Sequence, residues 1–353
     1  MRCDVKTLGI LKDKEVIAYE LINNNNMKVT ILNYGGIIKE ILVPDRKGNL
    51  ENIVLSFKDI NSYENCSTYL GAILGRTAGR IYKGMVTIDG VKYNLPINNG
   101  ENNIHGGIEN FSRIFWDAFV EESESKIILK MKLLSKDMEE GFPGNLDVEV
   151  KYILENDNTF TIEYYAKSDK DTLVNLTNHA YFNLSGNNKE SIENQYLQVN
   201  ADRYYKLSGN MALSGEISNV EGTPFDFRNL KKIGKDINKE DSQITIAKGY
   251  DHPWALNETS NKNINATLCD EKSGRVMDIS TDSPVIVIYT QNYGEAKEFE
   301  DGTSNETRRG ISFETQNPTI GVNEAFKEAS LLKSGEEFRK TAKFKFFTMA
   351  TEI

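Results

Sequence analysis

The chain has 353 residues and a formal net charge of −10, with 42 Lys and Arg against 52 Asp and Glu. This acidic balance excludes partners that are recognised by clustered cations, nucleic acids above all. No eighteen apolar residues stand together, and the amino-terminal segment lacks the apolar stretch of a signal peptide. We therefore expect a soluble, cytoplasmic protein with no membrane contact, whose partner is a neutral or cationic small molecule.

Strands with one buried face are predicted along the whole chain, because apolar and polar residues alternate at period two. The clearest segments are residues 28–32, 126–133, 147–154, 159–165 and 343–347. Asp89-Gly90 stands between two further runs and has the composition of a two-residue type I′ hairpin. Turns are also expected at 23–26 and 156–158, and short helices only at 59–63 and 235–241.

These strands predict an all-β chain of one domain, residues 1–353. No Gly/Ser-rich or Pro-rich linker divides it, and acidic and basic residues are mixed from end to end. One large antiparallel β-sandwich with few short helices, two packed sheets and a concave face for a site, is the simplest architecture.

The cysteines and histidines give little support to a metal or redox site. Cys3, Cys66 and Cys269 are odd in number and widely spaced, so we interpret them as free thiols. Neither His-x-His nor His-Glu-x-x-His occurs, and no two histidines are close in sequence. We do not expect a metal site, although one assembled from distant strands stays open at this stage.

Only three histidines occur, and each lies in a polar and aromatic cluster. Imidazole is the side chain best suited to proton transfer near neutral pH, so these clusters are candidate sites. His179 is expected at a strand or strand end, and His105 in a loop whose glycines let a ligand approach the backbone. For His179 and His252 the alternative is a buried structural imidazole satisfied by its neighbours.

Single charged residues near these clusters have equally ordinary explanations. Glu314 interrupts a strand-like run, and it faces either solvent or a polar cleft. A turn accounts for Asp251, and Arg76 and Arg80 are consistent with surface cations. None of these residues by itself indicates a catalytic function.

The order of these histidine clusters and charged residues along the chain is more specific than any one of them. The chain resembles the aldose 1-epimerases, or galactose mutarotases, over nearly its whole length. The segments that carry the resemblance are Asn33–Gly36, Gly75–Ile81, Asn103–Gly107, Glu140–Leu146, Asn178–Leu184, Thr223–Arg228, Tyr250–His252 and Phe313–Gln316.

The resemblance implies a β-sandwich with an open sugar-binding cleft. It also implies interconversion of the α and β anomers of free aldohexoses, such as galactose and glucose, without a cofactor. By resemblance Glu314 is the general base that takes the proton of the C1 hydroxyl, and His179 is the general acid that protonates the ring oxygen. Arg80, His105 and Asp251 match residues that bind and orient the sugar. His252 is assigned to structure.

Such chemistry is expected to use an ionised glutamate and a protonated histidine. A nearby carboxylate is expected to raise the pKa of His179, and Arg80 to keep Glu314 ionised. The chain departs from the family at two places. Gly79 stands where many members have Asn, and Val287 stands where some have Gln, a role that we do not transfer to the nearby Gln291.

Three other functions remain to be weighed. A hexose-6-phosphate 1-epimerase needs a cationic phosphate subsite, for which Arg76, Arg203 and Arg228 are the candidates. A non-catalytic carbohydrate-binding protein needs aromatic platforms, for which Trp116 and Trp254 are the candidates. A glycoside hydrolase is disfavoured because it normally uses two carboxylates, whereas a histidine holds the acid position here. The choice between a monomer and a homodimer stays open.

Overall fold

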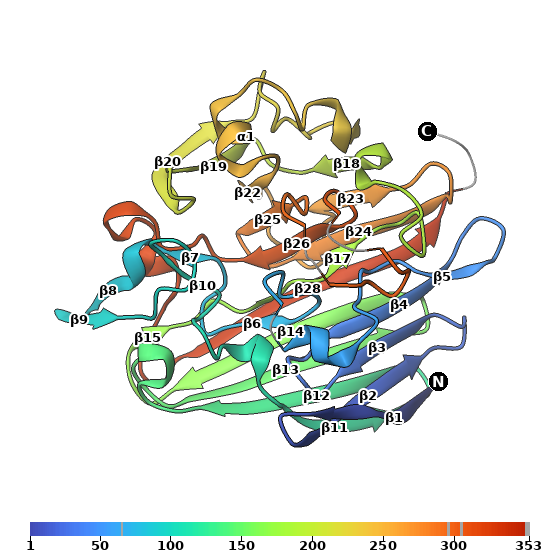
Figure 1. Cartoon of the computed structure of the whole chain (residues 1–353), viewed down its shortest axis with the longest axis horizontal. Coiled ribbons are helices and arrows are strands. Elements are labelled where there is room, and N and C mark those ends of the chain that lie inside the picture. Colours follow the sequence, from blue (N-terminus) through green and yellow to red (C-terminus); the bar gives the residue numbers. More distant parts are fainter. Residues whose placement is uncertain (65, 295–296, 304–305, 350–353) are drawn as a thin grey trace.

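The computed structural model describes residues 1–64, 66–294, 297–303 and 306–349, and its main elements are three antiparallel sheets (Figure 1). The first has five strands, which follow one another in chain order: Arg2–Leu11 (β1), Lys14–Ile22 (β2), Lys28–Leu32 (β3), Ile38–Pro44 (β4) and Leu50–Asn52 (β5).

The second sheet has nine strands, in the spatial order Asp117–Glu122 (β11), Lys126–Ser135 (β12), Leu146–Glu155 (β13), Thr159–Ser168 (β14), Glu337–Thr348 (β28), Arg275–Thr281 (β24), Ala266–Cys269 (β23), Tyr196–Val199 (β18) and Lys231–Lys232 (β21). The third has six, in the order Tyr181–Phe182 (β17), Ile311–Gln316 (β26), Val285–Tyr289 (β25), Asp251–Ala255 (β22), Arg203–Leu207 (β19) and Leu213–Asn219 (β20).

Short elements connect these sheets. Four strand pairs are Ile73–Leu74 (β6) with Thr177–Asn178 (β16), Arg80–Ile81 (β7) with Asn103–Ile104 (β10), Met85–Ile88 (β8) with Val91–Asn94 (β9), and Thr172–Leu173 (β15) with Leu331–Leu332 (β27). The helices within the described residues are Ser242–Ala247 (α1) and the 3-10 turns Ile60–Tyr63, Tyr82–Gly84, Phe111–Arg113, Glu139–Gly141, Ile192–Asn194, Ile233–Lys235, Val322–Glu324 and Lys327–Ala329.

One hydrophobic core joins the three sheets. It contains Ile41 from β4, Val150 from β13 and Ile288 from β25, all essentially inaccessible to solvent. Figure 1 shows the blue strands β2–β4 alongside the green strands β12–β14, with β25 and β26 next to β28. Burying each such side chain contributes about 2 kcal/mol, so the shared core fixes the sheets against one another. Each described helix is too short or too polar to cross a membrane.

The strand predictions are confirmed. Residues 28–32 coincide with β3, and the other four predicted segments fall inside β12, β13, β14 and β28. Asp89 and Gly90 join β8 to β9 with φ of 46° and 77°, as a type I′ turn requires. The turns at 23–26 and 156–158 are also present.

One helix prediction is confirmed and the other is wrong. Residues 60–63 form a 3-10 turn, but 236–241 are not helical, and the helix α1 starts only at Ser242. The reason is Asp241, whose carboxylate accepts from the backbone N–H groups of Gln243 and Ile244 and so caps the helix from outside. The charged residues before it form the turn that leads to this cap.

Candidate active site

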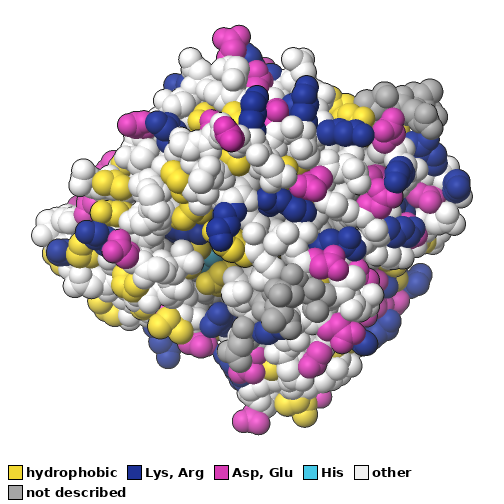
Figure 2. Space-filling model, turned by 45° about the horizontal axis from the view of Figure 1, so that its top comes forward, with side chains coloured by type: hydrophobic (Ala, Val, Ile, Leu, Met, Phe, Trp, Pro, Cys, Tyr) yellow, Lys and Arg dark blue, Asp and Glu magenta, His cyan; other side chains and the backbone are white. Residues whose placement is uncertain are grey.

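A cavity of about 400 Å³ opens beside β7, β22, β25 and β26 and contains every sugar-site residue predicted from the sequence. Its chemistry-bearing lining residues are Tyr69, Arg80, Asn98, Asn99, His105, Arg113, His179, Tyr181, Asp251, Tyr289, Tyr293, Glu314, Gln316 and Thr319. Figure 2 shows acidic and basic side chains interspersed on this face, with histidine visible only as a small spot of cyan inside a hollow. The outer surface is therefore mixed in charge, and the polar chemistry is inside.

His179 and Glu314 form the central contact. His179 lies in the short link between β16 and β17, and Glu314 lies in β26, the strand that pairs with β17. His179 Nε2 is 3.5 Å from Glu314 Oε1, and both side chains are about 5% exposed. The imidazole stacks on Tyr181 with ring centroids 4.8 Å apart, which holds the ring plane.

Burial opposes the charged forms of Glu314 and His179 that are expected from the sequence. Burial raises the pKa of Glu314 to about 8, helped by the nearby Asp251 carboxylate, and the opposing effect of Arg80 is smaller. Burial also lowers the pKa of His179 to about 4, although its own backbone carbonyl favours the charged ring. Desolvation is the largest cause of both pKa shifts, and it favours the neutral form of each side chain, with the proton on Glu314.

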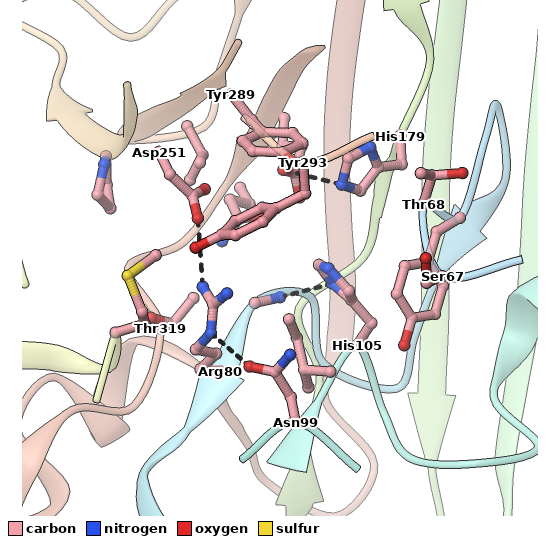
Figure 3. Close-up of a pocket in the computed structure, with 18 of the residues that line it drawn as sticks. Ser67, Thr68, Arg80, Asn99, His105, His179, Asp251, Tyr289, Tyr293 and Thr319 are labelled. Atoms are coloured by element: carbon pink, nitrogen blue, oxygen red, sulfur yellow. Dashed lines mark hydrogen bonds and ion pairs between the residues drawn. The ribbon is translucent and has the colours of Figure 1, made fainter. Parts of the chain in front are cut away.

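Arg80 and Asp251 face each other across the cavity (Figure 3). One terminal nitrogen of Arg80 is 3.5 Å from Asp251 Oδ2, and Arg80 Nε donates to Asn99 Oδ1 at 2.9 Å. Burial raises the pKa of Asp251 to about 6, while Arg80 opposes the rise. Above that pH the two side chains form an ion pair that leaves further Arg80 donors for a ligand.

His105 is held in one tautomer. The backbone N–H of Gly79 donates to His105 Nδ1 at 3.1 Å, so the neutral ring carries its proton on Nε2. Burial, His179 and Arg80 together keep the pKa of His105 well below its ordinary value. The ring packs edge-on against Tyr69 and His179, with centroids 4.7 and 5.4 Å away.

The glycines after His105 do not have the predicted role. A Cβ on Gly106 would meet the carbonyl oxygen of Gly75 at 2.0 Å, and one on Gly107 would meet the Glu140 carboxylate at 2.1 Å. Neither residue lines the cavity. These glycines admit protein neighbours rather than a ligand.

His252 has the structural role that was predicted. It is fully buried, its Nδ1 accepts from the Asp251 N–H, and its Nε2 lies 3.3 Å from Gln243 Oε1. Burial lowers the pKa of His252 to about 3. It therefore supports Asp251 from behind the cavity wall, as an uncharged ring.

The two departures from the family pattern have structural explanations. Gly79 has a φ of +70°, and a Cβ there would lie 2.1 Å from Thr319 Cγ2, so Thr319 fills the space of a side chain. Val287 pairs directly with Glu314 and contributes an apolar cavity wall. Gln291 accepts from the Arg309 and Gly310 N–H groups instead of reaching the cavity.

The candidate residues for the rival functions do not meet in the cavity. Arg76 is not a surface cation: it is 2% exposed and donates to the carbonyl oxygens of residues 135, 136 and 143. Arg228 pairs with Asp226, and Arg203 is exposed on β19. Trp116 and Trp254 are 3% and 0% exposed, so they present no platform to a sugar.

Sequence reasoning missed several lining residues. Tyr69, Tyr289 and Tyr293 supply aromatic surface, and Asn99 orients Arg80. Ser312, whose Oγ lies 3.3 Å from His179 Nδ1, was also missed. Strand alternation signals Ser312, because it stands two residues before Glu314 and thus on the same face of β26. No group of three or more potential metal-ligand side chains is found among the described residues.

Comparison with known proteins shows the family of the chain. The family model for aldose 1-epimerase matches residues 18–345. This chain belongs to the aldose 1-epimerase family. It is accordingly an isomerase that interconverts aldose anomers.

Individual relatives cover most of the chain. A galactose mutarotase from Bos taurus is 34% identical over 92% of each chain. An aldose 1-epimerase from Escherichia coli K12 is 32% identical over 77% of this chain and 78% of its own. The crystal structure of a galactose 1-epimerase from Lactobacillus acidophilus superposes with a TM-score of 0.88 at 30% identity, over 98% of this chain and 99% of that one.

Proposed function

We propose that this chain interconverts the α and β anomers of free galactose and glucose, with Glu314 as general base and His179 as general acid. The observation that carries the proposal is the buried 3.5 Å contact between His179 Nε2 and Glu314 Oε1 in a polar cavity. The C1 hydroxyl and the ring oxygen are bonded to the same carbon, so two groups this close together can reach both.

The two side chains share one titratable proton near neutral pH. A protonated Glu314 beside a neutral His179 has the same proton count as a carboxylate beside an imidazolium. A bound sugar whose C1 hydroxyl donates to Glu314 favours the second arrangement, because the carboxylate is the better acceptor. Arg80, His105 and Asp251 hold the other hydroxyls, and the Nε2–H of His105 is available as a donor.

The protons and electrons of ring opening are all accounted for by these two side chains and the sugar. Glu314 takes the C1 hydroxyl proton, the C1–O1 bond becomes a carbonyl, and the electrons of the C1 to ring-oxygen bond move to the ring oxygen, which takes the His179 proton. Rotation about C1–C2 presents the other face of the aldehyde. Closure reverses both proton transfers and yields the other anomer.

Polarimetry of freshly dissolved α-galactose tests the proposal. The chain should accelerate the change in rotation over the buffer blank, and Glu314→Gln and His179→Asn should each lower kcat by about 10²- to 10⁴-fold. Glu121→Gln, at an exposed position on β11, is a matched control that should keep full activity. A rate equal to the blank, or full activity in both site variants, contradicts the proposal.

We also propose that residues 1–353 act as one domain in the cytoplasm, as a monomer or homodimer. The core shared by the three sheets supports the first point, and the three free cysteines suit a reducing compartment. A single cooperative unfolding transition, observed by both circular dichroism and tyrosine fluorescence, is expected.

A further inference from the structure

Both ring nitrogens of His179 are contacted by one strand. Strand β26 carries Ser312 and Glu314 on the same face, about 7 Å apart along the strand. Ser312 Oγ is 3.3 Å from Nδ1, and Glu314 Oε1 is 3.5 Å from Nε2. Ser312 is fully buried, and its register partners on either side are Tyr181 and Tyr289. The imidazole therefore sits between two fixed polar groups.

The partner of Nδ1 distinguishes the three histidines. In His105 and in His252, Nδ1 faces a backbone N–H, of Gly79 and of Asp251 respectively. A backbone N–H can only donate, so charging either ring would set two donors against each other. At His179 the group that faces Nδ1 is a hydroxyl, which can donate or accept. Only there can the hydrogen bond survive both protonation states.

This hydrogen bond keeps its direction while the proton is transferred. A buried polar group without a partner is costly, and among the described residues Ser312 Oγ lies 3.3 Å from His179 Nδ1. When His179 is charged, Nδ1–H donates to Ser312 Oγ, and Nε2–H faces Glu314 and the cavity. When Nε2 has given up its proton, Nδ1–H still donates to Ser312 Oγ, and the lone pair of Nε2 faces Glu314.

We propose that Ser312 is a positioning residue for the anomerisation: its hydroxyl oxygen accepts from Nδ1–H in both charge states of His179, and so keeps Nε2 as the nitrogen that takes up and delivers the proton. This inference rests on the proposed function, and it explains why His179 rather than the neighbouring His105 acts as the acid.

The test combines kinetics and NMR on the full chain with Ser312→Ala, Ser312→Thr and Ser312→Cys. Ser283→Ala is the matched control, because Ser283 is also fully buried but its Oγ has no hydrogen-bond partner among the described residues. We expect Ser312→Ala to lower kcat for galactose about tenfold with KM changed less than about twofold, because the acid is misdirected rather than removed. The fall of kcat at low pH should move to lower pH, because the His179 imidazolium loses Ser312 Oγ as a hydrogen-bond acceptor and the pKa of His179 falls. Ser312→Thr should restore kcat to within about threefold, since the hydroxyl is kept.

Nitrogen-15 NMR of the histidine rings reads the tautomer directly, and the signals that vanish in His179→Asn identify His179. Neutral wild-type His179 should carry its proton on Nδ1, and Ser312→Ala should give a mixture of tautomers. Should Ser312→Thr misfold because of its extra methyl, Ser312→Cys should show an intermediate kcat. Unchanged kcat and an unchanged tautomer in Ser312→Ala would overturn the proposal.

The experiments distinguish a wrong proposal of anomerase activity from a wrong assignment of Ser312. A wild-type rate equal to the buffer blank refutes the anomerase function, while the tautomer of His179 still decides whether Ser312 directs the ring. A kcat loss in Ser283→Ala equal to that in Ser312→Ala would mean that any lost buried hydroxyl has this effect, and would contradict the positioning role.

Discussion

At the residue scale, burial decides which groups carry charge. Glu314 and His179 are each almost inaccessible to solvent, and desolvation shifts both toward their neutral forms. In the proposed mechanism, a protonated Glu314 beside a neutral His179 is also the state that the pair reaches when the sugar ring is open. Since Glu314 gains one proton as His179 gives one up, the pair holds one proton before and after ring opening, and the proposed reaction needs no external acid or base.

The first prediction concerns the pH dependence of kcat/KM, which reports ionisations of the free enzyme. The Glu314 pKa is raised to about 8, so above this pH the pair loses the proton that the ring oxygen needs, and activity should fall. The Asp251 pKa is raised to about 6, so below this pH its attraction to Arg80 is lost, and activity should fall again. Mutarotation rates corrected for the buffer blank should therefore be bell-shaped.

A different pH dependence of kcat/KM would contradict the proposal that Glu314 and His179 share one proton. If Glu314 acted only as an ionised base and the acid were supplied elsewhere, kcat/KM would rise as the pH passes through 8. Asp251→Asn provides a check on the fall in kcat/KM below about pH 6. In this variant that fall should disappear, even if the remaining activity is low.

The second prediction concerns Gly79. Gly79→Asn should destabilise the chain by about 1–3 kcal/mol, because its Cβ would overlap Thr319 Cγ2. The φ of +70° adds little, since Asn tolerates the left-handed region. Thr319→Ala removes the overlapping methyl, so the double variant should recover most of the loss. Urea unfolding measures both, and a double variant no more stable than Gly79→Asn would contradict the steric account.

At the scale of the elements, β26 organises the site. It places Ser312, Glu314 and Gln316 on one face through simple alternation, and its pairing with β17 brings His179 alongside. The segment from β6 to β7 supplies the opposite wall with Arg80. That segment is held by the buried Arg76, which ties it to the end of β12.

The third prediction follows from that anchor. Arg76→Met should lower the free energy of unfolding by about 2–5 kcal/mol, because the carbonyl oxygens of residues 135, 136 and 143 lose their donors inside the protein. Thermal unfolding measures the loss, and Arg203→Met at an exposed position on β19 is the control. A stable Arg76→Met variant with altered preference for phosphorylated sugars would instead indicate a phosphate-binding role.

The strands were predictable because alternation is a local signal, and the hairpin at Asp89-Gly90 because its turn type demands those residues. The helix α1 was misplaced because charged residues 235–240 resemble a helix, while the decisive cap at Asp241 depends on its backbone conformation. Glu314, His179, Arg80, His105 and Asp251 were found through the resemblance. Their burial, and thus the protonation of Glu314, depends on tertiary packing that no local pattern encodes.

At the scale of the whole molecule, the cavity is assembled from segments more than 200 residues apart, such as Arg80 and Glu314. The molecule is acidic overall, and the cavity is lined by two acidic residues, Asp251 and Glu314, and two arginines, Arg80 and Arg113. Acidic and basic side chains are interspersed on the face in Figure 2. This electrostatic setting favours neutral sugars.

The fourth prediction concerns that preference. The kcat/KM for glucose 6-phosphate should be at least about tenfold below that for glucose, because the phosphate is repelled by a chain of net charge −10 and by the Asp251 carboxylate in the cavity. The difference should shrink at high ionic strength, since salt screens the repulsion. Equal or faster anomer exchange with the phosphorylated sugar would contradict this view of the cavity.

The most direct test of the central claim is magnetisation exchange between the α and β C1 protons of galactose at equilibrium, which measures anomer exchange without any net reaction. We predict exchange well above the buffer rate with the wild-type chain and with Glu121→Gln, and exchange at or near the buffer rate with Glu314→Gln and with His179→Asn. Binding of galactose without faster exchange, or undiminished exchange in both site variants, would contradict the account.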